Sequence, residues 1–331
     1  MMRRPTIMHL VDDTTAGGVT RVLDHITTAP ALVVAGTHRV QTVVRGAVVP
    51  PRLEADIIVS HLAVSWRALP MLLALRLRHP KAVLVHVEHS YTEAFVALNV
   101  AKKRRFARLL QIAYSIFDRV VAVSEGQGAW LARSGAVKAR ALTVIRSCVD
   151  LSTFRALAPP AARVCVIGAI GRLDRQKGFD TLIEAFKLIR NPNVAWHIYG
   201  EGAEARALGD LAAGDARIRF MGFVDPLVAM ENIDAVAMPS RWEAYGLVAV
   251  EALSARRKLL VSDVDGLHDH LAYGAIAVHD RTVSAWYAAI EDLLGADPKP
   301  ASEASTPPFE QDFAEGWQRL VAKLSPRWTA V

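Results

Sequence analysis

Short apolar runs alternate along the chain with longer segments in which apolar residues recur at helical spacing. In the first half, the runs predict strands at Thr6–Val11, Ala31–Ala35, Thr42–Arg45, Asp56–Ser60, Val83–Val87, Val120–Ser124 and Leu142–Ile145. The helical spacing predicts helices at Val19–Ile26, Trp66–Arg78, Ala94–Ser115 and Gly126–Ser134. Strands that alternate with helices indicate a parallel, doubly wound sheet.

The same alternation starts again after Ala158–Arg163, a stretch with two prolines that is the best linker candidate. Strands are predicted there at Val164–Ile170, Ala195–Tyr199, Ile218–Met221, Ala235–Met238 and Lys258–Ser262, and helices at Phe179–Ile189, Ala203–Leu211, Leu247–Ala255 and Val283–Leu294. Asp297–Pro308 is expected to be a surface crossover, and Phe309–Leu324 has helical spacing. We therefore predict domains at residues 1–158 and 159–308, followed by a C-terminal helix within residues 309–331.

The composition fits two globular domains of about 150 residues each, because 331 residues that are 52% hydrophobic exceed the usual single core. Cys148 and Cys165 form neither a disulfide framework nor a metal-binding spacing, and the N-terminus leads into a strand rather than a secretory signal. No apolar run approaches the roughly 20 residues that span a bilayer. A cytoplasmic protein is the expectation.

Charge is divided unevenly between the two halves. Residues 1–158 hold 21 Lys and Arg against 10 Asp and Glu, a balance of +11, whereas residues 159–331 hold 18 against 23, a balance of −5. The basic run Lys102–Arg108 leads into the apolar Leu109–Tyr114, which predicts either a core helix with a solvated end or a helix on an anionic membrane. The basic balance favours the membrane surface, and nucleic acid is not expected.

Two clusters in the second half carry candidate chemistry. Glu243 and Glu251 stand eight positions apart, so that one acid lies in the loop after a predicted strand and the other in the following helix. Upstream, Arg172 and Lys177 flank a short loop that begins and ends with glycine, at Gly171 and Gly178. A nucleotide diphosphate needs such fixed cations and free backbone N–H groups. The pattern therefore points to an enzyme that handles a nucleotide sugar.

Taken together, the glycine-bearing N-terminal turn, Gly-Arg-Leu-x3-Lys-Gly and Glu-x7-Glu resemble the retaining glycosyltransferases of family four, the "glycosyl transferases group 1" domain. The resemblance runs from about residue 6 to about residue 295. It implies two doubly wound Rossmann-like domains that face each other across a cleft, the GT-B fold. It also implies that the first domain binds the acceptor, that the second binds the donor, and that the last helix returns to the first domain.

The resemblance assigns roles to individual residues. Arg172 and Lys177 would hold the diphosphate as it leaves, Glu243 would lie beside the transferred sugar, and Glu251 would accept the ribose hydroxyls. A histidine near the reacting sugar is expected in Val85–Tyr91, where His89 fits better than His86, although both stay open. The remaining expected donor contacts, mostly through backbone groups, are Gly17, Gly18, Gly200, Gly222, Phe223, Tyr245, Gly246 and Leu247.

Two short segments bear on the resemblance in opposite ways. Val123-Ser124-Glu125 matches the family's strand-end Ser-Glu. The family's Pro-Asn-Gly before Val-Asp is absent, since this chain reads Arg146-Ser147-Cys148-Val149-Asp150, and Arg146 is a conjectural substitute for the contact that is lost.

The function expected is metal-independent, hexosyltransferase-like transfer from a nucleotide sugar, with retention and without a cofactor, to a glycan or lipid-linked acceptor. The setting would be cell-surface polysaccharide or glycolipid biosynthesis, in the cytoplasm or at the inner face of the cytoplasmic membrane. The alternatives are a nucleotide-sugar epimerase on the same fold and a catalytically silent module that binds sugar nucleotides or glycans. A dinucleotide-dependent oxidoreductase lacks a convincing Gly-x-Gly-x-x-Gly after the first strand.

Overall fold

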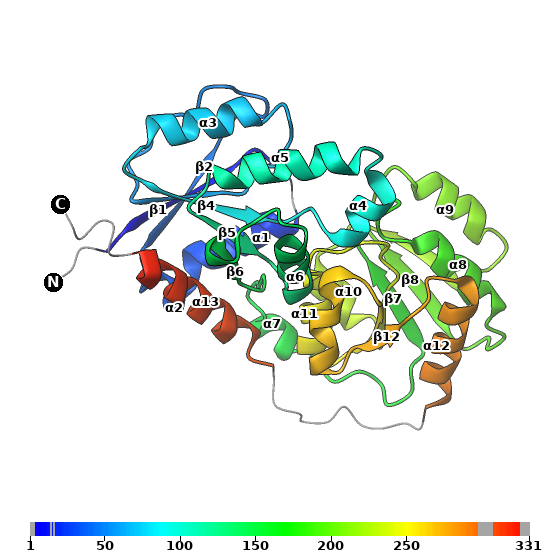
Figure 1. Cartoon of the computed structure of the whole chain (residues 1–331). Helices are drawn as coiled ribbons and strands as arrows, with labels where there is room; N and C mark the ends of the chain where they lie inside the picture. The colour runs from blue at the N-terminus through cyan, green and yellow to red at the C-terminus, as the bar shows by residue number, and fades with distance from the viewer. Residues whose placement is uncertain (1–3, 14, 16, 297–306, 325–331) are drawn as a thin grey trace. The chain divides into compact units, whose positions relative to one another are not determined.

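The computed structural model describes residues 4–13, 15, 17–296 and 307–324. These residues form two compact units, which are coloured along the chain in Figure 1. Unit 1 consists of the described residues up to Asp150 together with those from Pro308 onward, and unit 2 consists of the described residues between Leu151 and Pro307. Both units are α/β and doubly wound, which confirms the predicted fold class of each.

Unit 1 is built on a six-stranded parallel sheet with the order β2-β1-β3-β4-β5-β6. The strands are β1 (Thr6–Val11), β2 (Thr37–Thr42), β3 (Ile57–Ser60), β4 (Val83–Glu88), β5 (Arg119–Ala122) and β6 (Leu142–Val144). All residues of β3 and β4 are buried, as expected for central strands that are covered on both faces.

Helices cover both faces of this sheet. They are α1 (Gly18–Thr28), α2 (Pro30–Val33), α3 (Leu69–Arg78), α4 (Glu93–Asn99), α5 (Lys103–Ser115), α6 (Glu125–Arg133) and α13 (Phe309–Leu324), with the 3-10 turn η1 (Ala139–Ala141). Figure 1 shows α3 and α5 on one side of the sheet and α2 and α13 on the other. On the first side, Leu72 and Leu75 of α3 and Leu110 and Ala113 of α5 are buried in one core cluster with the strands.

The C-terminal helix α13 belongs to unit 1 and packs against α2. The Gln318 side chain donates to the Ala31 carbonyl at 2.8 Å. A Cβ on Gly316 would lie 3.0 Å from the Ile145 side chain, so the glycine allows close contact there. The helix therefore supplies part of the core of a unit from which it is distant in sequence.

Three elements of unit 1 differ from the sequence-based prediction. Residues 31–35 do not form a strand, because Pro30 at the first position of α2 starts a short helix instead. The strand predicted at residues 42–45 is β2, which lies earlier in the chain. It is a sheet edge whose residues are mostly exposed, so it carries little apolar signal. The helix predicted over residues 94–115 is two helices, α4 and α5.

Unit 2 contains a second six-stranded parallel sheet with the order β12-β11-β10-β7-β8-β9. Its strands are β7 (Val166–Ile170), β8 (Ala195–Tyr199), β9 (Ile218–Gly222), β10 (Ala235–Met238), β11 (Lys258–Ser262) and β12 (Ile276–Val278). Its helices are α7 (Ser152–Arg155), α8 (Phe179–Leu188), α9 (Ala205–Ala212), α10 (Pro226–Glu231), α11 (Leu247–Ser254) and α12 (Val283–Gly295), with the 3-10 segment η2 (Asp265–Tyr273).

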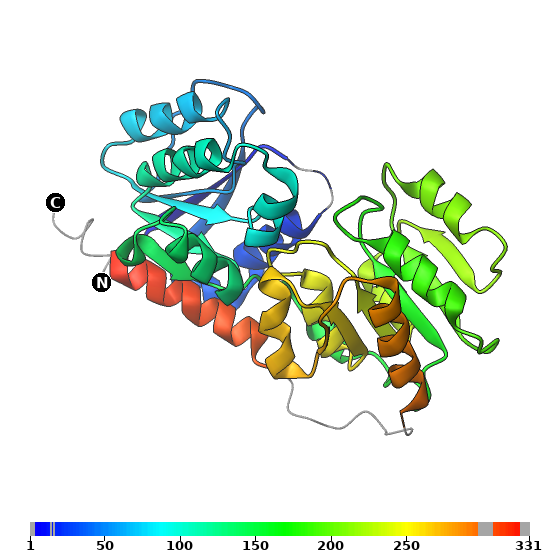
Figure 2. The same ribbon diagram turned by 45° about the vertical axis from the view of Figure 1, so that its right-hand side comes forward.

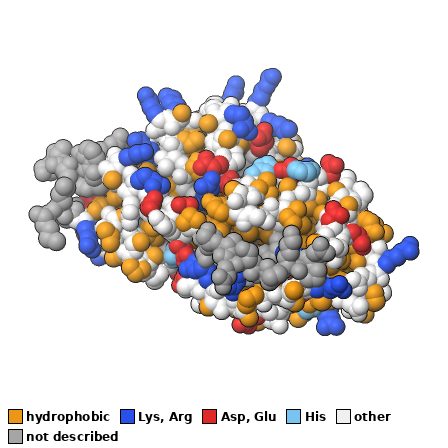
Figure 3. Space-filling model, turned by 90° about the horizontal axis from the view of Figure 1, so that it is seen from below, with side chains coloured by type: hydrophobic (Ala, Val, Ile, Leu, Met, Phe, Trp, Pro, Cys, Tyr) orange, Lys and Arg blue, Asp and Glu red, His pale blue; other side chains and the backbone are white. Residues whose placement is uncertain are grey.

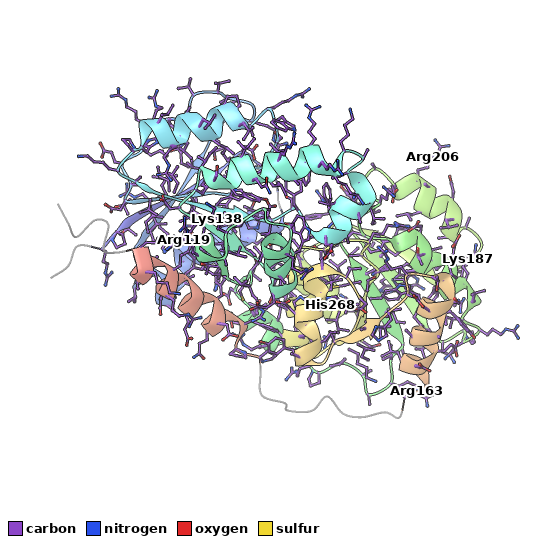
Figure 4. All side chains as sticks on the ribbon, viewed as in Figure 1. Arg119, Lys138, Arg163, Lys187, Arg206 and His268 are labelled. Carbon is purple, nitrogen blue, oxygen red and sulfur yellow. The ribbon has the colours of Figure 1, made fainter. Side chains whose placement is uncertain are left out.

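Helices α8, α9 and α12 pack together in unit 2, and α12 lies beside α8 in Figures 1 and 2. Lys187, labelled in Figure 4, ties α8 to α9 because its ammonium donates to the Leu211 carbonyl at 3.0 Å. The unit begins at Leu151, earlier than the proline-rich linker candidate, because Leu151 and Phe154 are buried and α7 packs on α10 and α11.

On the face shown in Figure 3, hydrophobic and charged side chains are interspersed. No helix in the described part of the chain combines the length and the apolar character needed to span a bilayer. The crossover predicted at residues 297–308 lies largely outside the described residues.

Candidate functional site

Glycines join three strand ends in unit 2. Gly171 and Gly200 directly follow β7 and β8, and Gly222 is the last residue of β9. The N–H of Gly200 donates to the Gly222 carbonyl at 2.8 Å, and that of Gly171 donates to the Tyr199 carbonyl at 3.0 Å. These are carboxyl ends of neighbouring parallel strands, so the three glycines lie at the sheet edge where α/β proteins bind ligands.

Two of these positions accept only glycine without a shift of the backbone. Gly171 has a φ of 153° and Gly200 a φ of 134°, which side chains rarely adopt. A Cβ on Gly200 would lie 1.9 Å from the Gly171 carbonyl oxygen, so the two loops touch through bare backbone. Beyond Gly222, the side chain of Phe223 is exposed at the rim.

Lys177 and Glu243 form an ion pair next to these glycines. The Lys177 ammonium donates to Glu243 Oε2 at 2.5 Å, and the two side chains are only 15% and 12% exposed. The Ser240 hydroxyl donates to the same carboxylate oxygen at 3.4 Å. Because both members are largely withdrawn from water, removal of either would leave the other charge uncompensated.

A tight turn places Lys177. Its N–H donates to the Asp174 carbonyl at 3.0 Å, and the next residue, Gly178, directly precedes α8 with a φ of 67°. A Cβ on Gly178 would lie 2.2 Å from the Pro239 carbonyl oxygen. Glycine therefore lets the start of α8 touch the end of β10, which brings Lys177 to Glu243.

The backbone of Glu243 is held by a turn that sequence reasoning missed. Its N–H donates to Asp265 Oδ2 at 3.3 Å, and its carbonyl accepts from the N–H of Gly266 at 3.0 Å. Asp265 has a φ of 42°, which is uncommon for a residue other than glycine. The available signal was the Asp-Gly pair after the strand at 258–262, since such pairs mark turns.

Arg172 differs from Lys177 although both belong to one loop. Its side chain is 76% exposed, with Nε 3.3 Å from Asp174 Oδ2 and Nη2 3.4 Å from Gln176 Oε1. The guanidinium thus remains accessible to an anion, whereas the Lys177 ammonium is enclosed and already paired.

The turn before α11 brings Tyr245, Gly246 and Leu247 together. Gly246 is the residue before the helix, with a φ of 88°, and a Cβ there would lie 2.9 Å from the Leu267 side chain. Tyr245 is buried, and its carbonyl accepts from His270 Nε2 at 2.7 Å. His270, which is also buried and was not predicted, therefore supports this turn.

Glu251 lies within α11, as predicted, and none of its surface is exposed. Its neighbours Val250 and Ala252 are also fully buried. A ligand could therefore reach the Glu251 carboxylate only after the surrounding side chains move.

In unit 1, Gly17 and Gly18 stand at the start of α1. Gly17 has a φ of −172°, which is extended backbone open to any residue, and a Cβ there would meet only the Thr15 carbonyl at 3.7 Å. Glycine is thus not sterically required at residue 17, and its contribution is a bare backbone before the helix.

Charges missed by the sequence analysis surround this loop. Arg45 pairs with Asp12 at 3.3 Å and with Asp13 at 3.0 Å. A hydrogen bond from the Thr15 hydroxyl is the largest of several contacts that lower the pKa of Asp13 to about 2. The side chains of Arg45 and Asp13 are largely exposed, so salt would screen the interaction between them.

His86 and His89 occupy different environments on β4 and just beyond it. His86 is buried beside Tyr114 and Phe117, and its Nε2 lies 3.4 Å from Glu88 Oε2. His89 is half-buried. Burial lowers the pKa of His89 to about 4, although the nearby charge of Glu88 acts in the opposite direction. His89 is thus a neutral imidazole near pH 7 and is the more accessible of the two.

Buried Glu88 fixes the loop that carries His89. Its Oε1 accepts from the N–H groups of Ser90 and Tyr91 at 2.7 and 2.9 Å, and its Oε2 accepts from the Tyr114 hydroxyl at 2.6 Å. Burial raises the pKa of Glu88, but the contacts with His86, Tyr114 and Tyr91 outweigh it and hold the pKa below its usual range.

The two segments that matched or departed from the family pattern lie in unit 1. Ser124 caps α6 by accepting from the N–H of Gln127 at 3.1 Å, and Glu125 begins the helix. Arg146, the proposed substitute cation, lies 3.5 Å from Glu125 Oε1. Within the described residues, no group of three or more His, Cys, Asp or Glu side chains is arranged to hold a metal ion.

Two sequence families match the chain, one in each half. The family described as Glycosyltransferase Family 4 matches residues 17–153, and the family described as Glycosyl transferases group 1 matches residues 164–296.

Among relatives, the glycogen synthase of Mycobacterium tuberculosis is 31% identical over 207 residues, which cover 57% of this chain and 48% of that protein. The D-inositol 3-phosphate glycosyltransferase of Jonesia denitrificans is 34% identical over 148 residues, which cover 39% of this chain and 35% of that protein. The matched part of the chain thus spans about half the length of these relatives, or less.

Two solved structures share the fold over nearly the whole chain. Anabaena Alr3699/HepE, in complex with UDP and glucose, gives a TM-score of 0.70 at 16% identity, covering 98% of this chain and 99% of that one. Sucrose-phosphate synthase from Thermosynechococcus elongatus gives 0.69 at 20% identity, covering 98% of each chain. The likeness at this identity concerns the fold, and together with the two family matches it shows that the chain belongs to the glycosyltransferases of the GT-B fold.

Proposed function

We propose that the protein transfers a sugar from a nucleotide-sugar donor to a glycan or lipid-linked acceptor, with retention of configuration. The observation that carries the proposal is the enclosed Lys177–Glu243 pair beside three touching strand-end loops of bare backbone. The relatives support it, since they are named as glycogen synthase and D-inositol 3-phosphate glycosyltransferase, and the Anabaena structure holds UDP and glucose.

The proposed donor site binds a diphosphate through two cations of different kinds. Arg172, being exposed, can form paired hydrogen bonds with phosphate oxygens as the donor enters. The Lys177 ammonium has three hydrogens and uses one toward Glu243, so it can also donate to a phosphate oxygen while staying paired. The N–H groups at the start of α11, after Gly246, add further donors for an anion or a hydroxyl.

Glu243 and Glu251 have separate roles in this proposal. Glu243 orients Lys177 and stands beside the transferred sugar, whose developing positive charge it would stabilise. Glu251 accepts the ribose hydroxyls once donor binding has opened access to its buried carboxylate.

Transfer proceeds in the proposal by attack of an acceptor hydroxyl on the anomeric carbon from the face that the diphosphate leaves. The bond from the anomeric carbon to the phosphate oxygen breaks, the new glycosidic bond forms, and the hydroxyl proton passes to the departing diphosphate. Arg172 and Lys177 neutralise the charge of that leaving group. In comparable sites, such groups stabilise the transition state by several kcal/mol. The proposed reaction uses no cofactor.

The acceptor side includes a basic surface in unit 1. A hollow of about 680 Å³ is lined by Trp66, Ala101, Lys102, Lys103, Arg104, Arg105 and Arg108, and the Arg105 guanidinium lies 5.4 Å from the Trp66 ring centroid. The apolar face of α5 is buried in the core, so it cannot insert into lipid and any membrane contact must rest on these charges and on Trp66. We propose that this basic surface binds the anionic inner face of the cytoplasmic membrane, where a lipid-linked acceptor would reside.

Acceptor-dependent release of nucleoside diphosphate tests the transfer reaction. UDP-glucose and other nucleotide sugars are first screened for thermal stabilisation of the protein, and stabilising donors are then incubated with a panel of glycans and glycolipids. Release only in the presence of an acceptor supports transfer, and the configuration of the product tests retention. Donor binding without turnover on any acceptor would favour the silent module, and interconversion of the donor sugar would favour an epimerase.

Sedimentation with liposomes tests the basic surface separately. Binding should rise with anionic lipid, fall with salt, and weaken when Lys102, Lys103, Arg104 and Arg105 are changed to Ser, by about 1 kcal/mol for each charge. The control replaces Arg206 and Lys187, basic residues of unit 2. Equal binding of the four-residue variant and wild type would contradict the assignment.

A further inference from the structure

Four histidines of unit 1 form one continuous row of hydrogen bonds. His38 Nδ1 lies 3.0 Å from His9 Nε2, His9 Nδ1 lies 2.9 Å from His61 Nε2, and His61 Nδ1 lies 2.8 Å from His89 Nε2. Their ring centroids are 5.3, 5.2 and 5.1 Å apart in the same order. The row joins the half-buried His89 to His38 through the fully buried His9.

Strand register creates this row. In the β1–β2 pair His38 stands opposite Ile7, and His9 is two residues farther along β1. In the β1–β3 pair Ser60 stands opposite Leu10, which puts His61 two residues beyond His9.

In the β3–β4 pair Ser60 stands opposite His86, which puts His89 two residues beyond His61. A step of two keeps all four side chains on one face of the sheet. On that face, the Trp317 ring of α13 meets His9 edge-on at 5.8 Å.

The hydrogen-bond count restricts the tautomers of the row. A neutral imidazole has one N–H donor and one nitrogen acceptor. Each bond joins an Nε2 to an Nδ1, so all four rings must carry hydrogen on Nε2 or all four on Nδ1. One mismatched ring would place two donors or two acceptors against each other, which is costly inside a protein. Consequently, only one of the two end nitrogens, His89 Nδ1 and His38 Nε2, carries a hydrogen.

Burial keeps the row uncharged near neutral pH. It is the largest cause that lowers the pKa of His38 to about 4, and it also lowers those of His9 and His61 well below the ordinary value. The other titratable groups near the row are His86, which lowers the pKa values of His61 and His89, and Glu88, which raises that of His89. Within the described residues, His89 Nδ1 makes no hydrogen bond, so it is the end of the row that remains open to a ligand.

We propose that His61 and His9 are positioning residues that hold His89 in a single neutral tautomer, so that Nδ1 offers one defined hydrogen-bonding group to the sugar substrate. The proposal rests on the proposed function, because sugar transfer is what gives Nδ1 a substrate. Positioning of this kind matters because small misplacements of reacting groups are costly in rate.

The first experiment reads the tautomers directly, in the full chain labelled with ¹⁵N-histidine. Two buried histidines outside the row serve as internal references. His79 Nε2 accepts from the N–H of Leu53, so its hydrogen is on Nδ1, whereas His270 Nε2 donates to the Tyr245 carbonyl. At pH 7 the ring ¹⁵N signals of all four histidines should show the same tautomer, either that of His79 or that of His270. Mixed tautomers among the four rings would overturn the proposal.

The second experiment breaks the row at His61. His61→Phe keeps an aromatic ring but removes both nitrogens, whereas His61→Gln has an amide that can both donate and accept. The control is His25→Gln, a histidine of the same unit that lies outside the row and stacks on Phe313. In His61→Phe the His89 signal should move toward a tautomer mixture, and kcat/KM for transfer should fall about tenfold. His61→Gln should recover much of both, and His25→Gln should resemble wild type.

The outcomes separate this inference from the proposed function. An unchanged His89 signal in folded His61→Phe would overturn the row as a tautomer lock, as would full transfer activity in that variant. Should wild type transfer no sugar to any acceptor, the proposed function would fail while the tautomer result would stand. Thermal unfolding of each variant reports whether it is folded. The tautomer measurement on the wild-type chain tests the row even if a variant does not fold.

Discussion

The polar groups that gather at the two candidate sites differ in charge. In unit 2, an ion pair between Lys177 and Glu243 and the fully buried Glu251 gather at the strand ends. In unit 1, the strand ends and strand interiors carry neutral imidazoles, from His38 to His89, which hydrogen-bond to one another. Two sheets with the same parallel topology therefore prepare two different kinds of site.

The difference follows from how each unit brings polar groups together. Unit 2 uses loops, since Gly178 and Gly200 let backbones touch and Gly171 leaves room for the Lys177 side chain beside it. Unit 1 uses register, since its histidines stand on adjacent strands at a step of two. Enclosed charges are costly unless each is paired, whereas neutral imidazoles need only complementary hydrogen bonds. A site that meets a diphosphate needs the charges, and a site that meets sugar hydroxyls can remain neutral.

The largest effect is expected from breaking the charged side of this comparison. Lys177→Ala should reduce transfer by at least about a hundredfold, roughly 2.7 kcal/mol, because it removes leaving-group stabilisation and leaves Glu243 without its ammonium partner. Lys187→Ala is the matched control, since Lys187 belongs to the same unit but donates to the Leu211 carbonyl of α9 rather than to a residue of the proposed site. Steady-state kinetics of both purified variants provide the measurement, and wild-type turnover in Lys177→Ala would remove that residue from the proposed site.

The charged residues of unit 2 could be chosen as site candidates from the sequence, whereas the row of four histidines in unit 1 could not. Lys177 stands next to Gly178, Glu243 follows a strand end, and Glu251 lies eight positions farther along in the next helix, all of which local patterns reveal. His9 and His38 are 29 positions apart, and His61 and His89 are 28 apart, so only strand register brings these four rings together.

The place of His38 in the row depends on β2, an exposed edge strand without an apolar pattern, which was predicted too late in the chain. The supporting turn at Asp265 was missed for a related reason, because its contact with Glu243 spans 22 residues.

A second prediction concerns acid stability and tests whether the imidazole row is neutral. The unfolded chain binds protons at its histidines near pH 6.5, whereas His38 and His89 in the folded chain do so only near 4. In that window the unfolded state binds more protons, so the free energy of unfolding should fall as pH decreases from about 6.5 to 4. Each such histidine contributes up to about 1.4 kcal/mol per pH unit.

Replacing one ring should therefore flatten the pH profile. His38→Gln removes a titrating group at the end of the row and should reduce the slope by up to one proton. Urea unfolding at several pH values between 4 and 7 provides the measurement. Parallel profiles for wild type and variant would mean that His38 is protonated alike in both states, which is incompatible with a neutral row.

The smallest effect is expected at the one buried charge near the row. Tyr114→Phe removes the hydroxyl that donates to Glu88 Oε2 at 2.6 Å and should lower the free energy of unfolding by about 1.5 kcal/mol at pH 7. The folded pKa of Glu88 lies below its ordinary value, so the stabilisation is present above about 4.3 and is lost as pH falls through the folded pKa. The difference between variant and wild type should therefore shrink in acid.

Tyr287→Phe is the control for this last change, because Tyr287 is only partly buried and its hydroxyl makes no hydrogen bond within the described residues. It should unfold like wild type at every pH. A Tyr114→Phe difference that stays constant down to pH 3 would mean that the hydroxyl contributes through packing rather than through the Glu88 carboxylate. Glu88 would then hold the loop that carries His89 through the N–H groups of Ser90 and Tyr91 alone.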